Sequence, residues 1–194
     1  MHTRSTLKAA LVCLVLLAPL AARGQDSAAV SRRLSSRVAS ERRAAAEELA
    51  RLAAVGHRRL VEGYRVQEKD AAVKLALEWA LYRMGRHPSL FTLVDALDEK
   101  KRAEQAVGYL KQLESPAPLY VFLNHVNGNT TIRLLEVLAH LGDRDTLERL
   151  KPFAASLDPA IADAAMFAER EITIRLEETP AVEPKRERKV GQPE

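Results

Sequence analysis

The feature that most constrains this 194-residue chain is a helix-start signal that recurs about every thirty residues. Short polar side chains accept hydrogen bonds from the free N–H groups of a first helical turn. Such a residue precedes an Ala- and Leu-rich stretch at five places, at intervals of 30, 28, 31 and 29 residues: Ser40, Asp70, Asp98, Asn129 and Asp158. One helix start per period of this length is typical of an array of stacked helix pairs.

We expect each repeat to hold a first and a second helix, with the second helix starting at the polar residue. Between residues 73 and 84, apolar residues three and four apart form one helix face, while Leu75, Trp79 and Tyr82 form another. A helix that is apolar on two sides lies between neighbours. No segment alternates apolar and polar residues for the length of a strand. The sequence therefore predicts an all-α fold of about five helix pairs with no β structure.

Proline and glycine mark the expected ends of these helices. Proline is favoured at the first position of a helix, and glycine ends helices in a left-handed conformation. A glycine inside a helix also lets a neighbour approach closely, and Gly108 is expected to do so. The end positions are Pro88, Pro116 and Pro159 at helix starts, and Gly56, Gly85 and Gly142 at helix ends.

The first 24 residues have the layout of a secretory signal. Arg4 and Lys8 precede an apolar run over residues 9–22, and small residues stand where a signal peptidase cuts, before and at Gly24. The run is shorter than the about 20 residues that span a bilayer. We therefore expect a signal peptide over residues 1–24 and an exported protein, periplasmic or extracellular, in a bacterial envelope. Retention of the segment as an anchor is the alternative.

We expect the repeat domain to span residues 25–178. Residues 179–194 hold three prolines and a charged run but too few apolar residues for a core, so a disordered tail is expected there. Removing residues 1–24 also removes three basic residues and the single cysteine, Cys13, which leaves 27 Lys and Arg against 26 Asp and Glu. This near-neutral balance, with no recognition motif, argues against nucleic acid as a partner.

Charge is unevenly distributed along the chain. Residues 30–65 carry nine arginines against four glutamates, a net charge of +5, whereas residues 151–180 carry a net charge of −3. A basic first repeat suits an anionic envelope surface, or head-to-tail contact with the acidic end of another molecule. Solvated terminal repeats would show the same charges, because the ends of a repeat array need polar outer faces.

Two segments carry a family resemblance, ALEWALYRMG at residues 76–85 and RLLEVLAHLGD at residues 133–143. They resemble the second-helix pattern of HEAT-like repeats, in the short-repeat, bilin-lyase-like group, over about residues 30–177. The resemblance implies a right-handed α-solenoid whose second helices line the concave face and bind proteins there.

Three basic residues recur four positions after a helix-start residue, so stacked second helices would display them as a row. Acidic residues and a histidine on the same helices complete a candidate partner-binding set. The alternative is ion pairing within the molecule or a solvated surface. The set is Lys74, Glu78, Arg102, Arg133, Glu136 and His140.

No catalytic constellation is visible in the sequence. The histidines after the signal are scattered over four repeats, and no HExxH, GxSxG or phosphate-binding loop occurs. Asp143 and Asp145 stand at a helix start, where capping is their expected role. We assign no catalytic residue, metal ligand or cofactor, and expect a non-enzymatic scaffold that binds another macromolecule, in the first place a protein, along its second helices. The alternatives are a small lyase or hydrolase on a HEAT scaffold, and a peripheral envelope adaptor bound through the basic first repeat; the oligomeric state stays open.

Overall fold

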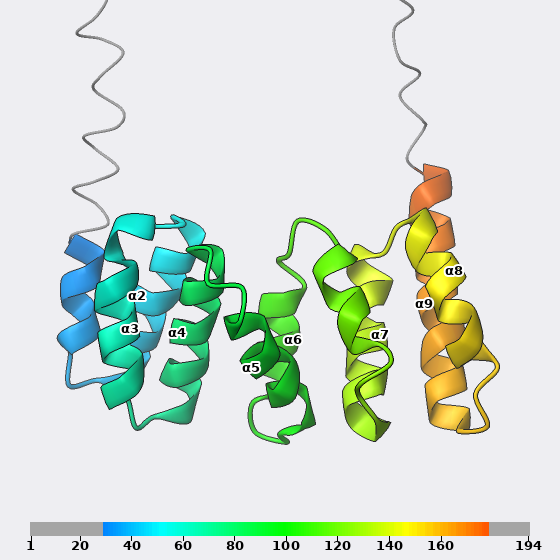
Figure 1. The fold of residues 1–194 in the computed structure, drawn as a ribbon, viewed down its shortest axis with the longest axis horizontal. Helices are drawn as coiled ribbons and strands as arrows, with labels where there is room; N and C mark the ends of the chain where they lie inside the picture. The colour runs from blue at the N-terminus through cyan, green and yellow to red at the C-terminus, as the bar shows by residue number, and fades with distance from the viewer. Residues whose placement is uncertain (1–28, 179–194) are drawn as a thin grey trace, which may run out of the picture. The chain divides into compact units, whose positions relative to one another are not determined.

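The computed structural model describes residues 29–178 (Figure 1). Every regular element of this part is a helix, so the prediction of an all-α fold without strands is confirmed for these residues. The chain divides into two compact units, Met1–Gln112 and Leu113–Glu194. The expected signal peptide (residues 1–24) and tail (residues 179–194) lie outside the described residues. None of the helices within residues 29–178 is long and apolar enough to cross a membrane.

The first unit is built around one central helix. This helix, α4, packs against α2, α3, α5 and α6. It buries Val73 and Leu77 on one face and Leu75 and Trp79 on the other, as its two apolar stripes predict. The elements of the unit are η1 (Arg33–Ser35), α2 (Ala39–Arg51), η2 (Val55–His57), α3 (Arg58–Gln67), α4 (Ala71–Arg83), α5 (Ser89–Asp95), η3 (Ala96–Asp98) and α6 (Ala103–Leu110).

The second unit packs two helices on a third. Both α7 and α8 contact α9, the longest described helix, whose Ala165, Ala168 and Ile172 are buried. Arg175 of α9 donates hydrogen bonds to the carbonyl oxygens of Ala139 and Gly142, at 2.9 and 2.6 Å, and so satisfies the end of α7. The elements are η4 (Ala117–Phe122), α7 (Gly128–Leu141), α8 (Arg144–Ala154) and α9 (Pro159–Glu178).

Two of the five expected helix starts are confirmed. Asp70 Oδ1 accepts hydrogen bonds from the N–H groups of Ala72 and Val73, at 2.9 and 3.0 Å, at the start of α4. Asp158 Oδ1 accepts one from Ala160 at 2.9 Å at the start of α9. Asp143 likewise forms a reciprocal capping box at the start of α8, as expected.

The other three expected starts are wrong. Ser40 lies inside α2, and the turn before this helix uses Ser36, whose hydroxyl accepts from the N–H of Val38 at 3.1 Å. Asp98 ends the short helix η3, and a separate turn precedes α6. Asn129 lies inside α7, which begins at Gly128. The residue that precedes the helix thus lies two to four residues from the expected one, at Val38, Arg102 and Asn127, and in the first two cases a neighbouring turn or short helix displaces the start.

The predicted roles of the glycines and prolines are also confirmed only in part. Gly85 adopts the expected left-handed conformation after α4, with φ of +89°. Gly142 is extended and not left-handed, with φ of −59° and ψ of 152°, and lies where close packing leaves no room for a side chain. Gly56 lies within η2 and is not left-handed; the left-handed residue after α2 is Ala53, with φ of +45°. Pro159 begins α9 as predicted, whereas Pro88 and Pro116 each stand one residue before a helix.

Candidate binding groove

The expected partner-binding residues are divided between the two units. In the first unit, Lys74 is exposed on α4, and Arg102 stands before α6 and forms an ion pair with Glu99. In the second unit, the half-buried Arg133 and Glu136 each have an interaction partner within the molecule, while His140 is exposed. The structure does not establish the row of basic residues as one site.

Glu78 belongs to the interior and not to the surface. Its side chain is 3% exposed and lies between two arginines. Arg65 Nη1 donates to one carboxylate oxygen at 3.0 Å, and Arg86 Nη1 lies 3.4 Å from the other. Arg86 also donates to the hydroxyl of the buried Ser89 at 2.9 Å. The carboxylate therefore holds α3, α4 and the turn before α5 together, because a buried charge needs partners of this kind.

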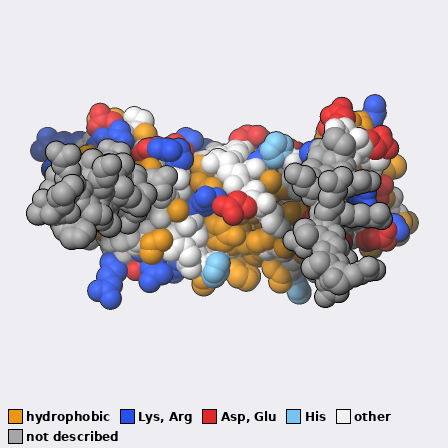
Figure 2. Space-filling model, turned by 90° about the horizontal axis from the view of Figure 1, so that it is seen from above, with side chains coloured by type: hydrophobic (Ala, Val, Ile, Leu, Met, Phe, Trp, Pro, Cys, Tyr) orange, Lys and Arg blue, Asp and Glu red, His pale blue; other side chains and the backbone are white. Residues whose placement is uncertain are grey.

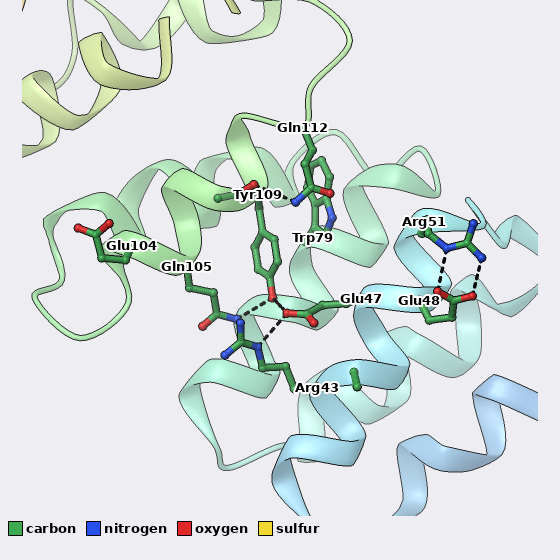
Figure 3. A pocket seen from close by; sticks show the side chains of 11 residues that line it. Arg43, Glu47, Glu48, Arg51, Trp79, Glu104, Gln105, Tyr109 and Gln112 are labelled. Atoms are coloured by element: carbon green, nitrogen blue, oxygen red, sulfur yellow. Dashed lines mark hydrogen bonds and ion pairs between the residues drawn. The ribbon is translucent and has the colours of Figure 1, made fainter. Parts of the chain in front are cut away.

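A groove of about 550 Å³ runs over α2, α4 and α6 of the first unit (Figure 3). These three are the second helices of the expected repeats. All of the lining residues come from these helices or directly follow α6, and they are Arg43, Ala44, Glu47, Glu48, Arg51, Trp79, Glu104, Gln105, Gly108, Tyr109 and Gln112.

Two stacked aromatic rings form the base of this groove. The rings of Trp79 and Tyr109 lie 5.7 Å apart between centroids and are nearly parallel, at 3°. Both side chains are largely buried, with 3% and 5% of the residue surface exposed. Helix α4 supplies the tryptophan from its second apolar stripe, and α6 supplies the tyrosine. Stacking of this kind fixes the distance and angle between two neighbouring second helices.

Hydrogen bonds of Tyr109 tie all three helices together. Its hydroxyl donates to Glu47 Oε1 of α2 at 2.6 Å and accepts from Gln105 Nε2 at 2.7 Å. The same Gln105 nitrogen donates to the carbonyl oxygen of Ala72 in α4 at 2.9 Å. Burial, and after it the hydrogen bond to Glu47, raises the pKa of Tyr109, so the phenol stays protonated. These bonds join α2, α4 and α6 without any partner, so the groove is already formed in the free protein.

The walls of the groove are polar but their charges are paired. Arg43 Nε contacts Glu47 Oε1 at 2.8 Å, and Arg51 Nη2 contacts Glu48 Oε1 at 2.6 Å. The lining holds three carboxylates and two guanidinium groups, so it has no strong charge of either sign. Gly108 leaves the groove open above the tyrosine; a Cβ there would meet nothing within 4 Å. The expectation that Gly108 admits a neighbouring helix is thus wrong.

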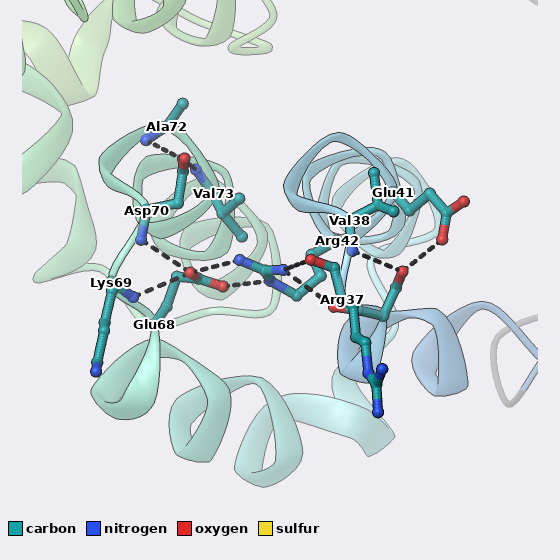
Figure 4. Close-up of polar contacts among 10 residues, drawn as sticks. Arg37, Val38, Glu41, Arg42, Glu68, Lys69, Asp70, Ala72 and Val73 are labelled. Carbon is teal, nitrogen blue, oxygen red and sulfur yellow. Dashed lines mark hydrogen bonds and ion pairs between the residues drawn. The ribbon is translucent and has the colours of Figure 1, made fainter.

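A second hollow, of about 390 Å³, lies where α2 meets the turn between α3 and α4, and Figure 4 shows the polar contacts among residues at this place. Arg42 donates two hydrogen bonds to Glu68, at 2.7 and 2.9 Å, and one each to the carbonyl oxygens of Ser36 and Arg37. Glu68 also accepts from the N–H groups of Lys69 and Asp70, both at 2.9 Å. This fully partnered pair is a structural clamp with little left to bind a ligand.

The remaining polar cluster lies in the second unit and supports the capping box of α8. The Tyr120 hydroxyl donates to Asp143 Oδ1 at 3.0 Å and lies 2.7 Å from the Thr146 hydroxyl. The guanidinium of Arg149 covers the Tyr120 ring, 4.3 Å from its centroid. Burial acts to raise the pKa of Asp143, but hydrogen bonds from Thr146 and Tyr120 outweigh it and lower the pKa. The cluster orients a helix end.

Within residues 29–178, no three His, Cys, Asp or Glu side chains are placed to hold a metal ion. Comparison with protein-family models, with curated proteins and with solved structures finds no match to this chain. Of the hollows and polar clusters described above, the groove over α2, α4 and α6 has the geometry best suited to binding, and we take it as the candidate site.

Proposed function

We propose that this protein is a HEAT-like helical-repeat scaffold that acts after export and binds another protein along its second helices. In this proposal the repeats form a right-handed α-solenoid, and the groove over α2, α4 and α6 is the binding site. The single observation that carries the proposal is that the groove is lined by the second helices, with Gln112 just after α6 as the one addition. The resemblance in the sequence assigns binding to these same helices.

The chemistry of the groove suits a segment of polypeptide. Its base is aromatic and rigid, and the paired charges of its walls favour no strongly acidic or basic ligand. The side-chain nitrogens of Gln105 and Gln112 are bonded within the molecule, while their carbonyl oxygens accept no hydrogen bond from the described residues. Amide oxygens in this position can accept from the backbone N–H groups of a bound segment.

Two glycines provide a matched test of the groove. Gly108 and Gly63 are each the sixth residue of their helix, α6 and α3, and both are exposed. An added Cβ meets nothing within 4 Å at either position. Because any ordinary residue favours a helix more than glycine does, neither substitution should lower stability. Gly108→Trp fills the groove, whereas Gly63→Trp adds the same ring on a helix that does not line it.

The experiment is affinity capture from a native envelope extract, followed by titration with the purified partner. We expect wild type and Gly63→Trp to retain the same partner, and Gly108→Trp to lose it, with all three equally helical. A partner held equally well by Gly108→Trp would contradict the groove as the site. A Lys74→Glu/Arg133→Glu variant completes the set, because loss of the partner from that variant alone would move the site to the basic row.

A further inference from the structure

The turn that joins α2 to α3 carries apolar and basic side chains at its surface. We name residues 55–60, which comprise η2 and the start of α3, the basic tip. Val55 is 58% exposed and Leu60 is 43% exposed, and between them Arg58 and Arg59 are both exposed. Large aliphatic side chains next to arginines on a protruding turn are typical of segments that enter the boundary of a lipid layer.

Arg58 and Arg59 have no stabilising role within α3. The first turn of α3 contains no acidic residue, so Arg58 and Arg59 stand at the positive end of the helix dipole, where cations are unfavourable. Most other arginines of the unit have acidic partners, among them Arg42, Arg51 and Arg65. In the described part of the chain neither Arg58 nor Arg59 has one. Their charge is therefore available to an external anion.

The arginine nearest the basic tip in sequence, Arg51, is paired with Glu48, so the positive charge offered to an external anion is that of Arg58 and Arg59. The hydrogen bond from Arg51, together with the more distant charge of Arg33, lowers the pKa of Glu48 near the end of α2. Arg51 is the last residue of α2, and the turn that leads to the basic tip follows it directly. In Figure 2, Lys and Arg side chains are visible at several points around the N-terminal unit.

The turn that presents the basic tip has a defined shape. Ala53 is held in the left-handed conformation, and the N–H of Ala54 donates to the carbonyl oxygen of Leu49 at 3.2 Å. The N–H of His57 then donates to the carbonyl oxygen of Ala54 at 2.8 Å, which closes η2. Because these bonds order the backbone in advance, Val55 can be presented to a surface without ordering a loop first.

We propose that the basic tip docks on an anionic lipid surface, with Val55 and Leu60 entering the interface and Arg58 and Arg59 contacting lipid phosphates. A convex turn of six residues favours lipid over an acidic protein, since a stable protein interface buries about 800 Å² on each partner. Lipid headgroups can surround a protruding turn, and each basic residue near an anionic membrane adds to the affinity. The proposal is independent of the groove and of the partner bound there.

The test is co-sedimentation of the full chain with two vesicle types, phosphatidylcholine alone and phosphatidylcholine with about 30% phosphatidylglycerol, a fraction chosen for its surface potential. The readout is the ratio of the two affinities, since uncharged contacts from any part of the chain contribute equally to both. Three variants are compared with wild type: Arg58→Glu/Arg59→Glu, Val55→Ser/Leu60→Ser, and the control Lys100→Glu/Lys101→Glu. The control makes the same charge change at two exposed lysines between η3 and α6.

We expect wild type and the control to bind the anionic vesicles at least about tenfold more tightly than the neutral ones. The Arg58→Glu/Arg59→Glu variant should lose this preference, and added salt should remove it from wild type. The Val55→Ser/Leu60→Ser variant should keep the preference but bind both vesicles more weakly. Equal loss in the control, or an unchanged preference in Arg58→Glu/Arg59→Glu, would overturn the proposal. The proposal would also be overturned if Arg58 and Arg59 were required for binding to an acidic protein and not for binding to lipid.

Discussion

At the scale of single residues, Ala53 and Gly85 occupy the same position after two neighbouring helices. Each is the left-handed residue after a second helix, with φ of +45° and +89°. In each case the next N–H donates to the carbonyl oxygen five positions earlier, Ala54 to Leu49 and Arg86 to Leu81. Only glycine adopts this conformation without steric strain. The left-handed alanine after α2 therefore lowers the stability of the fold, whereas the glycine after α4 does not.

Exchanging the two residue types should change stability in opposite directions. We expect Ala53→Gly to raise the free energy of unfolding, and Gly85→Ala to lower it, each by about 1 kcal/mol. Urea denaturation followed by circular dichroism measures both. If Ala53→Gly were as destabilising as Gly85→Ala, flexibility lost on folding would outweigh relief of strain, and the explanation would fail.

Glu68 gives a single-residue prediction about pH. The two hydrogen bonds from Arg42 hold its pKa at about 2, well below the ordinary glutamate value of 4.5; burial opposes them, and the Asp70 N–H assists them. Because the folded-state pKa is lowered, this carboxylate stabilises the fold fully above about pH 4.5, and the contribution is lost as pH falls toward 2.

The difference between wild type and Glu68→Gln isolates this contribution from the other carboxylates. We expect the variant to be less stable at pH 7, and the two proteins to converge in stability between pH 4.5 and pH 2. Urea unfolding at a series of pH values provides the comparison. A stability difference that stays constant down to pH 2 would mean that the Arg42 contact is not ionic.

At the scale of the element, α4 is held by packing on two faces and by a buried ionic cluster. Glu78 lies between Arg65 and Arg86, and the Nε of Arg65 is buried without a hydrogen-bond partner. One donor of the cluster already lacks a hydrogen-bond acceptor, so no spare acceptor is present to replace the carboxylate of Glu78 if it is removed. Glu78 is buried, but Arg65 and Arg86 are 27% and 34% exposed, so loss of the carboxylate leaves two partly solvated guanidinium groups without their acceptor, which costs about 1–3 kcal/mol.

Glu78→Gln should therefore lower the free energy of unfolding by about 2 kcal/mol. The matched control is Glu62→Gln, since Glu62 is 42% exposed and its carboxylate lies 4.0 Å from Arg86 Nε. An exposed pair of this kind contributes less than about 1 kcal/mol. Thermal and urea denaturation of the two variants should separate them clearly, and a Glu78→Gln protein as stable as the control would show that solvent reaches the cluster.

The helices of the fold were largely predictable, whereas their starting residues were not. Two-sided apolar spacing identified α4, because burial on both faces is a local property of the sequence. Asp70 and Asp158 were predictable as caps because nothing near them competes for the first turn. Ser40 and Asp98 failed because a neighbouring turn or short helix displaced the helix start. Such competition depends on tertiary packing, which the helix propensities of single residues do not describe.

At the scale of the whole molecule, the groove could be predicted only in part. The sequence assigned Trp79 to a second apolar stripe on α4 but gave no indication of its partner. Tyr109 reaches Glu47 across 62 residues of chain, and its stacking on Trp79 depends on how α6 packs. A period of about thirty residues indicates which helices are neighbours, but not which side chains meet between them. The ion pairing of Glu78 was hidden for the same reason.

The division into two compact units leads to a prediction about unfolding. The boundary lies between Gln112 and Leu113, so a lesion should act on the unit that contains it. Gly142→Ala is a lesion of the second unit, because its Cβ would lie 2.6 Å from the backbone oxygen of Leu138 and even closer to Ile172 Cδ1. Overpacking of this kind costs about 1–3 kcal/mol. Glu78→Gln is the corresponding lesion of the first unit.

Hydrogen exchange read by mass spectrometry resolves the two units in one protein. We expect Gly142→Ala to speed exchange in α7, α8 and α9 while α2 and α4 keep their protection, and Glu78→Gln to do the reverse. Each lesion lowers the opening free energy only of the helices it supports if the units unfold separately. Faster exchange in all helices for either variant would instead mean that the chain unfolds as one cooperative array, in which each repeat stabilises the next. The pattern thus decides whether the groove retains its shape when the second unit opens.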